Sequence, residues 1–331
     1  MRHHQAEIDR IREIIRTKGR FVLTTHVNAD GDGIGSELAL YHHLRGLKKE
    51  VHIFNPSPLP GVYRFLDPEG TRIQEYEEHH AHTVLDADAL FVLDLSNTDR
   101  LGALGRVLAE NRPLQICIDH HPQKNASCPL SWIDDQAAAT GELVFLLLKQ
   151  DGHEISRAIA EALYVALLTD TGSFHYANVT AQTHRVVAEL LETGIDHHGI
   201  YRCLYESNTW NQSMLFAETI SGLKRACSGK VGWMKISRQM FEETGAQEKD
   251  IEGLAEFPRS IGEVQIAILF IEQTPDRVRV RLRSKNDVAV DGLARELGGG
   301  GHRNAAAAVI KGTTLEGAVD KVLALASDYV H

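Results

Sequence analysis

The sequence reads Phe21-Val-Leu-Thr-Thr-His-Val-Asn-Ala-Asp-Gly-Asp-Gly-Ile-Gly-Ser36 near its beginning. The first five residues form an apolar run that is typical of a buried strand. The glycine-rich turn behind them opens a helical pattern that extends from Ser36 to Leu47. The stretch therefore predicts a strand, a loop and a helix, which together are one unit of an α/β fold.

The same alternation continues along the first half of the chain. Apolar runs predict further strands at 51–54, 89–95 and 114–118, and helical patterns lie near 100–110 and 140–150. Strands that are rich in Val, Ile and Leu and alternate with helices are typical of a parallel sheet covered on both faces. We therefore expect an N-terminal α/β domain with a doubly wound, mainly parallel sheet.

The second half shows a different pattern. Three apolar or alternating runs, at 231–236, 264–271 and 278–282, follow one another without a regular helix between each pair, which favours a smaller α+β domain. A length of 331 residues also favours two domains. We expect a catalytic domain at 1–185, a helical linker at 186–213, and a second domain at 214–331 that binds substrate.

Composition excludes several classes of protein. The chain has 35 Lys and Arg against 45 Asp and Glu, a formal charge of −10, which disfavours nonspecific binding to a long nucleic-acid duplex. The longest apolar runs fall far short of the ~20 residues that a membrane span needs. The four cysteines show no C-x-x-C spacing, and the N-terminus reads as an amphipathic helix rather than a secretion signal. We expect a cytoplasmic protein that does not bind membranes.

Acids and histidines follow the predicted strands at the places where they end. In parallel α/β sheets, ligands bind at the carboxyl ends of the strands, so these side chains should converge on one edge of the sheet. One further acid follows the apolar helical run 162–168. The converging residues are His26, Asp30, Asp32, Asp94, Asp119, His120, His121 and Asp170.

So many carboxylates in one place would repel one another by several kcal/mol unless cations neutralise them. Carboxylate and imidazole ligands without thiolate suit Mn²⁺ or Mg²⁺ better than structural zinc. Two such ions can activate water and stabilise charge during displacement at phosphorus. The sequence therefore predicts two divalent cations, with Mn²⁺ favoured over Mg²⁺ or Co²⁺, and phosphoryl chemistry.

The order and spacing of these residues resemble the four motifs of the DHH phosphoesterase superfamily. Gly298-Gly-Gly-Gly-His-Arg-Asn-Ala-Ala306 resembles the signature of the associated DHHA1 domain. The resemblance covers nearly the whole chain and is greatest to the group of bifunctional nanoRNases and 3′-phosphoadenosine 5′-phosphate (pAp) phosphatases. It implies hydrolysis of short single-stranded oligonucleotides or dinucleotides to mononucleotides, and of pAp to AMP.

The resemblance also implies a role for each site residue. His26, Asp30 and Asp94 would hold one metal, and Asp94 would be shared with the second metal. The other ligands of the second metal would be Asp32, His120 and Asp170. Asp119 would orient a ligand, and His121 would donate to a phosphoryl oxygen or to the leaving group, so that Asp94, Asp119 and His121 are the catalytic residues.

The C-terminal part has features suited to binding an anion. In Arg277-Val-Arg-Val-Arg-Leu-Arg-Ser-Lys285 the basic residues alternate with apolar ones, so a strand would place the cations on one face. The four glycines at 298–301 would let backbone N–H groups approach an anion closely. We expect a substrate to bridge the two domains, with its distal nucleotide bound by Arg283, Ser284, Gly299, Gly300, Gly301, His302 and Arg303.

Other patterns in the sequence allow other interpretations. Ile195-Asp-His-His198 repeats the letters of Ile118-Asp-His-His121 but follows a helix ending rather than a strand, so we expect only the earlier copy to be catalytic. The glycines at 31, 33 and 35 lack the G-x-G-x-x-G spacing of a Rossmann oxidoreductase. Hydrolysis of cyclic or linear dinucleotides, of inorganic pyrophosphate, or nucleotide sensing without turnover stay open, as does a homodimer.

Overall fold

The computed structural model describes residues 4–95, 98–108, 113–122, 128–150, 152–251, 253–285 and 288–330, without the side chains of Thr98, Asp99 and His302. It divides into two units, 1–207 and 208–331. Of the segment predicted as a linker, 186–213, the part before Asn208 belongs to the first unit and the rest to the second. Among the described residues, none of the helices has the length and apolar character needed to cross a membrane.

The first unit contains a six-stranded sheet in the order β3-β2-β1-β4-β5-β6, in which every neighbouring pair is parallel. The strands are β1 (Arg20–Thr24), β2 (Glu50–Asn55), β3 (Ile73–Glu75), β4 (Ala89–Leu93), β5 (Leu114–Asp119) and β6 (Leu130–Ile133). The helices are α1 (Gln5–Thr17), α2 (Gly31–Gly46), α3 (Ala81–Leu85), α4 (Gly102–Leu108), α5 (Thr140–Gln150), α6 (Arg157–Asp170), α7 (Ala181–Glu192) and α8 (His197–Tyr205).

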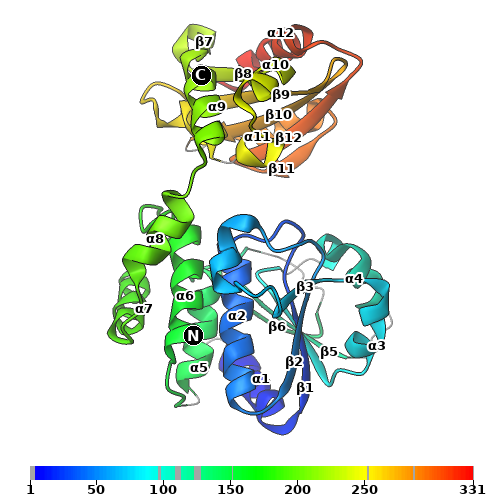
Figure 1. Cartoon of the computed structure of the whole chain (residues 1–331), viewed down its shortest axis with the longest axis vertical. Helices are drawn as coiled ribbons and strands as arrows, with labels where there is room; N and C mark the ends of the chain where they lie inside the picture. Colours follow the sequence, from blue (N-terminus) through cyan, green and yellow to red (C-terminus); the bar gives the residue numbers. More distant parts are fainter. Residues whose placement is uncertain are drawn as a thin grey trace. The chain divides into compact units, whose positions relative to one another are not determined.

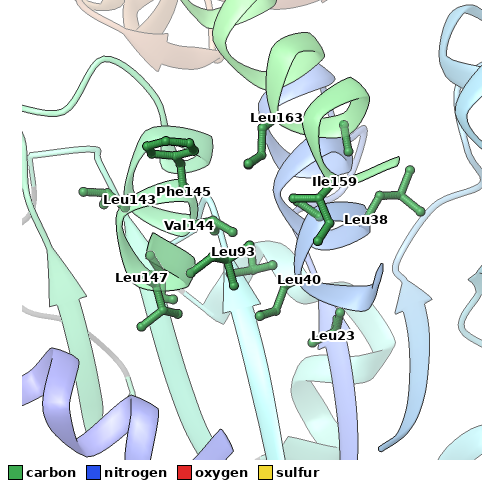
Figure 2. Close-up of a cluster of buried hydrophobic side chains, with 14 of the residues drawn as sticks. Leu23, Leu38, Leu40, Leu93, Leu143, Val144, Phe145, Leu147, Ile159 and Leu163 are labelled. Atoms are coloured by element: carbon green, nitrogen blue, oxygen red, sulfur yellow. The ribbon is translucent and has the colours of Figure 1, made fainter. Parts of the chain in front are cut away.

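Alternate residues of each central strand pack on opposite faces of the sheet. Leu23 and Leu93 join the core beneath α2, α5 and α6, whereas Val22 and Val92 pack against the residues of α3 and α4 on the other side of the sheet (Figure 1). Figure 2 shows the larger core, in which leucines of the strands meet apolar side chains of the three helices. Period-two burial on both faces confirms the predicted doubly wound α/β domain.

Two features of this unit differ from the sequence prediction. The outer strands β3 and β6 are short and were not predicted. The prediction that the helix begins at Ser36 was also wrong, because α2 begins at Gly31 with Asp30 as its N-cap. A Cβ atom added at Gly35 would collide with the Ala162 carbonyl of α6, so the glycines allow α2 and α6 to pack closely.

The second unit contains a sheet in the order β11-β12-β10-β9-β8-β7, with β8 and β9 parallel and the other pairs antiparallel. This mixed sheet confirms the predicted smaller α+β region in the C-terminal part of the chain. Its strands are β7 (Lys224–Ala226), β8 (Val231–Ile236), β9 (Ile266–Thr274), β10 (Arg277–Ser284), β11 (Gly300–His302) and β12 (Ala305–Lys311). Its helices are α9 (Trp210–Ser221), α10 (Arg238–Thr244), α11 (Val290–Glu296) and α12 (Leu315–Ala326).

Candidate dimetal active site

The predicted acids and histidines meet at the carboxyl edge of the first sheet. The strand order reverses between β1 and β4, which is the place where α/β sheets usually bind ligands. Asp94 directly follows β4, and Asp119 is the last residue of β5. Asp170 ends α6, a helix that packs closely against α2. The structure therefore brings together residues from four separate parts of the chain.

One group of possible metal ligands contains His26, Asp30 and Asp94. The Nε2 atom of His26 lies 3.5 Å from Oδ2 of Asp94 and 3.7 Å from Oδ2 of Asp30. The Nδ1 atom of His26 lies 2.9 Å from the Val27 carbonyl and 3.1 Å from the Arg100 guanidinium. In the tautomer that donates the Nδ1 proton to Val27, Nε2 keeps a lone pair that faces both carboxylates. A lone pair and two carboxylates are all electron donors, so this arrangement suits a cation between them.

A second group contains Asp32, His120 and Asp170. The Nε2 atom of His120 lies 3.3 Å from Asp170 Oδ2 and 3.7 Å from both Asp32 Oδ2 and Asp94 Oδ1. This nitrogen is buried and has no hydrogen-bond partner among the described residues. A buried polar atom without a partner is costly, and a divalent cation would satisfy it together with the carboxylates.

Residues that sequence reasoning missed hold two of the carboxylates in place. The N–H groups of Thr140 and Gly141, at the start of α5, donate to the Asp32 carboxylate over 2.6 and 2.8 Å. The Thr140 hydroxyl donates to Asp94 Oδ1 over 3.0 Å. The first N–H groups of a helix have no partner within it and favour negative charge, so α5 fixes both acids. No local pattern identifies these contacts, because each joins distant parts of the chain.

Asp94 also has an unusual backbone. Its φ angle is +58°, in the left-handed region that residues other than glycine rarely adopt. Its N–H donates to the Ile118 carbonyl of the neighbouring strand over 3.0 Å, which holds this conformation. Strained residues of this kind persist where the surrounding structure fixes them, and they cluster at functional sites.

His121 is held by Asp119. The Asp119 Oδ1 atom accepts hydrogen bonds from the His121 backbone N–H over 3.1 Å and from its Nδ1 over 2.8 Å. This hydrogen bond raises the pKa of His121 to about 9. The His121 side chain is 43% exposed, so the imidazole has one side on Asp119 and another toward solvent. A ring nitrogen of His121 also belongs to a third group of possible metal ligands, together with Asp94 and His120.

Three carboxylates of the site, those of Asp32, Asp94 and Asp170, are costly to ionise where they lie. Burial, together with the charges of neighbouring carboxylates, raises the pKa of Asp94 well above its usual range and raises that of Asp170 to about 8. Burial also raises the pKa of Asp32, against the opposing effect of His120. Like charges held this close ionise together only when cations are present. The donor set and its electrostatics therefore fit divalent cations.

Two of the predicted substrate-binding residues, Arg283 and Ser284, lie on β10. The arginines at odd positions of β10 share one face, as the alternation predicts, but Nε of Arg283 donates to Glu256 over 2.5 Å. Ser284 is 1% exposed, and its hydroxyl donates to the Val288 carbonyl over 2.6 Å. The substrate role of both residues stays a prediction.

The glycine segment of the second unit forms a strand rather than an open loop. Gly300 and Gly301 lie in β11, paired with β12, and Gly299 directly precedes that strand. A Cβ atom at Gly299 would collide with the Ala307 carbonyl, so close packing of the two strands requires glycine there. Arg303 is exposed in the turn that follows, and the His302 side chain lies outside the described residues.

The repeated Ile-Asp-His-His sequence lies elsewhere. Asp196 is the N-cap of α8, and its side chain accepts a hydrogen bond from the Gly199 N–H over 2.9 Å. His197 and His198 are exposed, and neither belongs to a possible metal-ligand group among the described residues. This copy serves to begin a helix.

Comparison with known proteins defines the class. Residues 20–167 match the model of the DHH family, N-terminal domain, and residues 231–331 match the DHHA1 domain. The chain therefore belongs to the DHH/DHHA1 phosphoesterase superfamily, as the motifs predicted.

Among particular relatives, it is 31% identical to the bifunctional oligoribonuclease and PAP phosphatase NrnA of Thermus thermophilus, over 95% of this chain and 91% of that protein. It is 27% identical to the protein of the same name from Bacillus subtilis, over 90% and 92% of the two chains. An exopolyphosphatase-related protein from Bacteroides fragilis has a crystal structure that superposes with a TM-score of 0.92, at 28% identity over 98% and 97% of the two chains.

Proposed function

We propose that this protein is a dimetal phosphoesterase that hydrolyses short oligonucleotides to mononucleotides and dephosphorylates pAp to AMP. The observation that carries the proposal is the buried His120 Nε2 atom, which faces Asp32, Asp94 and Asp170 without a hydrogen-bond partner among the described residues. The names of its NrnA relatives support the choice of substrates.

The proposed ligands divide into two sets that share Asp94. His26, Asp30 and Asp94 hold one cation, and Asp32, Asp94, His120 and Asp170 hold the other. The mixture of carboxylate oxygen and imidazole nitrogen favours Mn²⁺ over Mg²⁺. When bound, the cations lower the pKa of a water molecule and stabilise negative charge on the phosphoryl oxygens.

The remaining residues orient the proposed ligands and donate hydrogen bonds. Asp119 fixes the His121 ring through Nδ1, which leaves its other nitrogen free to donate to a phosphoryl oxygen or to the leaving oxygen. Thr140 and Gly141 hold Asp32, so the acid cannot turn away from His120. Each of these contacts fixes the site before substrate arrives, which reduces the reorganisation needed during reaction.

The second unit supplies the proposed substrate contacts from its basic and glycine-rich segments: Arg283, Ser284, Gly299, Gly300, Gly301, His302 and Arg303. A net charge of −10 disfavours long duplexes and supports small substrates. We further propose that the protein is cytoplasmic and that it can form a homodimer.

One panel of substrates tests the activity. The purified protein with Mn²⁺ is assayed against pAp, 5′-phosphorylated diadenylate, a pentanucleotide RNA, cyclic di-AMP and pyrophosphate. We expect turnover of pAp and of the short linear RNAs, its loss on chelation, and its return with Mn²⁺. Release of phosphate from pyrophosphate alone would overturn the proposed substrate class, and preference for cyclic di-AMP would favour a cyclic-dinucleotide phosphodiesterase.

Asp94→Asn tests the shared ligand. Because Asp94 belongs to both proposed ligand sets, we expect turnover to be lost and Mn²⁺ no longer to raise the melting temperature, whereas Mn²⁺ stabilises the wild-type protein. The matched control is Asp135→Asn, which changes an exposed acid after β6. Normal turnover in Asp94→Asn would contradict the assignment.

A further inference from the structure

Three exposed tyrosines form a face of the first unit that the proposed chemistry does not use. Tyr176 is 47% exposed, and Tyr201 and Tyr205, one turn apart on α8, are each 41% exposed. The rings of Tyr201 and Tyr205 lie 4.8 Å apart. Burial raises the pKa of the Tyr205 phenol, and the neighbouring phenols of Tyr176 and Tyr201 raise it further. We call these three exposed tyrosines the tyrosine face.

The tyrosine face is attached to the proposed metal ligands. The Tyr176 N–H donates over 3.0 Å to the carbonyl of Thr171, the residue directly after Asp170. The Asn178 side chain donates over 3.1 Å to the Asp170 carbonyl itself. The segment that carries Tyr176 is thus bonded to the backbone around Asp170, so Tyr176 is the member of the face that is held next to a proposed metal ligand.

The turn between Asp170 and Tyr176 has an unusual backbone. Gly172, Ser173 and Phe174 have φ angles of +54°, +59° and +65°, and two of these residues are not glycine. A Cβ atom added at Gly172 would collide with the Tyr176 ring, so this ring lies directly over the turn. Consecutive left-handed residues are costly, and here they place the ring of Tyr176.

We propose that the tyrosine face is a stacking platform for the base of a nucleotide whose phosphate lies at the dimetal site. This inference rests on the proposed function. It specifies how the protein selects nucleotides over other phosphate esters. Flat rings with exposed π faces stack on any nucleobase, which suits short substrates of mixed sequence. The cations held by the carboxylates of the dimetal site would attract the phosphate of the same nucleotide. One ligand would then occupy both the tyrosine face and the dimetal site.

The test compares two substrates that differ only in the base. Steady-state rates are measured with Mn²⁺ for pAp and for ribose 3,5-bisphosphate, which lacks the adenine. In Tyr176→Leu and Tyr205→Leu, which remove the π face, we expect KM for pAp to rise about tenfold with little change in kcat. KM for ribose 3,5-bisphosphate should stay at its wild-type value. Tyr176→Phe and Tyr205→Phe keep a flat ring and should recover most of the affinity for pAp.

A matched control removes a tyrosine from another place. Tyr76 packs against the core on the opposite face of the sheet, among residues of α3 and α4, so Tyr76→Leu should leave both KM values unchanged. Equal losses for both substrates in the leucine variants, or no loss for either, would overturn the platform. A change in oligomeric state of these variants would instead assign the face to a second copy of the chain and would also overturn it.

Failure of the proposed function is separable from failure of the platform. In that case the wild-type protein would hydrolyse neither substrate. Calorimetric titration of pAp and ribose 3,5-bisphosphate into the wild-type and leucine variants would then decide the platform by itself. Preference of the wild type for pAp, lost in Tyr176→Leu and Tyr205→Leu, is the expected result, and equal binding of both compounds overturns the inference.

Discussion

The same four residues, Ile-Asp-His-His, occur twice in this protein and do different things. At 118–121 they close β5, and the imidazole of His120 faces three carboxylates. At 195–198 they begin α8, where the aspartate caps the helix and the imidazole of His197 is exposed. In both copies the isoleucine is buried. The difference therefore lies in what surrounds the polar residues.

The comparison teaches that the preceding element decides the role of the motif. A parallel strand delivers its last residues to the edge where neighbouring strands deliver theirs, so the charges accumulate there. A helix N-terminus instead offers free N–H groups, and one carboxylate accepts from them without needing a cation. Each prediction that follows alters one copy of the motif or its surroundings.

The largest expected effect comes from the first histidine of the first copy, and its counterpart in the second copy is the matched control. His120→Asn removes a proposed metal ligand, so we expect kcat/KM for pAp to fall more than about 100-fold, beyond the range for groups that only orient a ligand. His197→Asn should retain wild-type kcat/KM. Steady-state kinetics over a range of Mn²⁺ concentrations checks both variants. Similar losses in the two would remove the distinction between the copies.

The aspartate of the first copy should matter less than the histidine beside it. Asp119→Asn weakens the hydrogen bond that orients His121, and we expect activity or metal affinity to fall about 10- to 100-fold. Steady-state kinetics over a Mn²⁺ titration separates a loss of activity from a loss of metal affinity. A loss as large as that of His120→Asn would show that Asp119 is itself a ligand, and the exposed Asp135→Asn is the control.

The stability of the metal-free protein should depend on pH through the acids around the first copy. Burial raises the pKa of Asp170 from 3.8 to about 8, so the folded state retains a proton that the unfolded state releases. Its contribution is complete below the unfolded pKa and is lost as the pH rises toward the folded pKa.

Urea unfolding with chelator at about pH 5.5 and about pH 8 measures this loss, which Asp170→Asn should reduce. Mn²⁺ at about 100 times its Kd should add about 2.7 kcal/mol to the unfolding free energy. A chelated protein that is more stable at the higher pH, or an Asp170→Asn variant with the wild-type slope, would contradict this expectation.

The smallest effect should come from the aspartate of the second copy. Asp196→Ala removes the N-cap of α8, which typically costs about 1 kcal/mol, while Mn²⁺-dependent hydrolysis is retained. Chemical denaturation measures the cost, and Asp196→Asn, which can still accept from the Gly199 N–H, should restore most of it. Loss of activity without loss of stability would give this copy a role that the structure does not indicate.

Much of the fold and the composition of the candidate site could be predicted from local patterns. Apolar runs located the four central strands, and the residues after them supplied the acids and histidines that the structure brings together. Short outer strands escaped prediction because three or four residues carry too little periodicity. The first turn of α2 was missed because glycine has low helix propensity. Its glycines instead allow close contact with α6 and with Thr25, directly after β1.

The sequence by itself determined which chemical groups this protein carries to the sheet edge, because strand periodicity and the residues that end strands are local properties. Only the tertiary structure decided how those groups are held. Asp32 accepts from the N–H of Thr140, a residue 108 positions away, and that contact exists because α5 and α2 pack together in the same core on one face of the sheet. Packing between distant elements fixes such contacts, and no local pattern of residues records them.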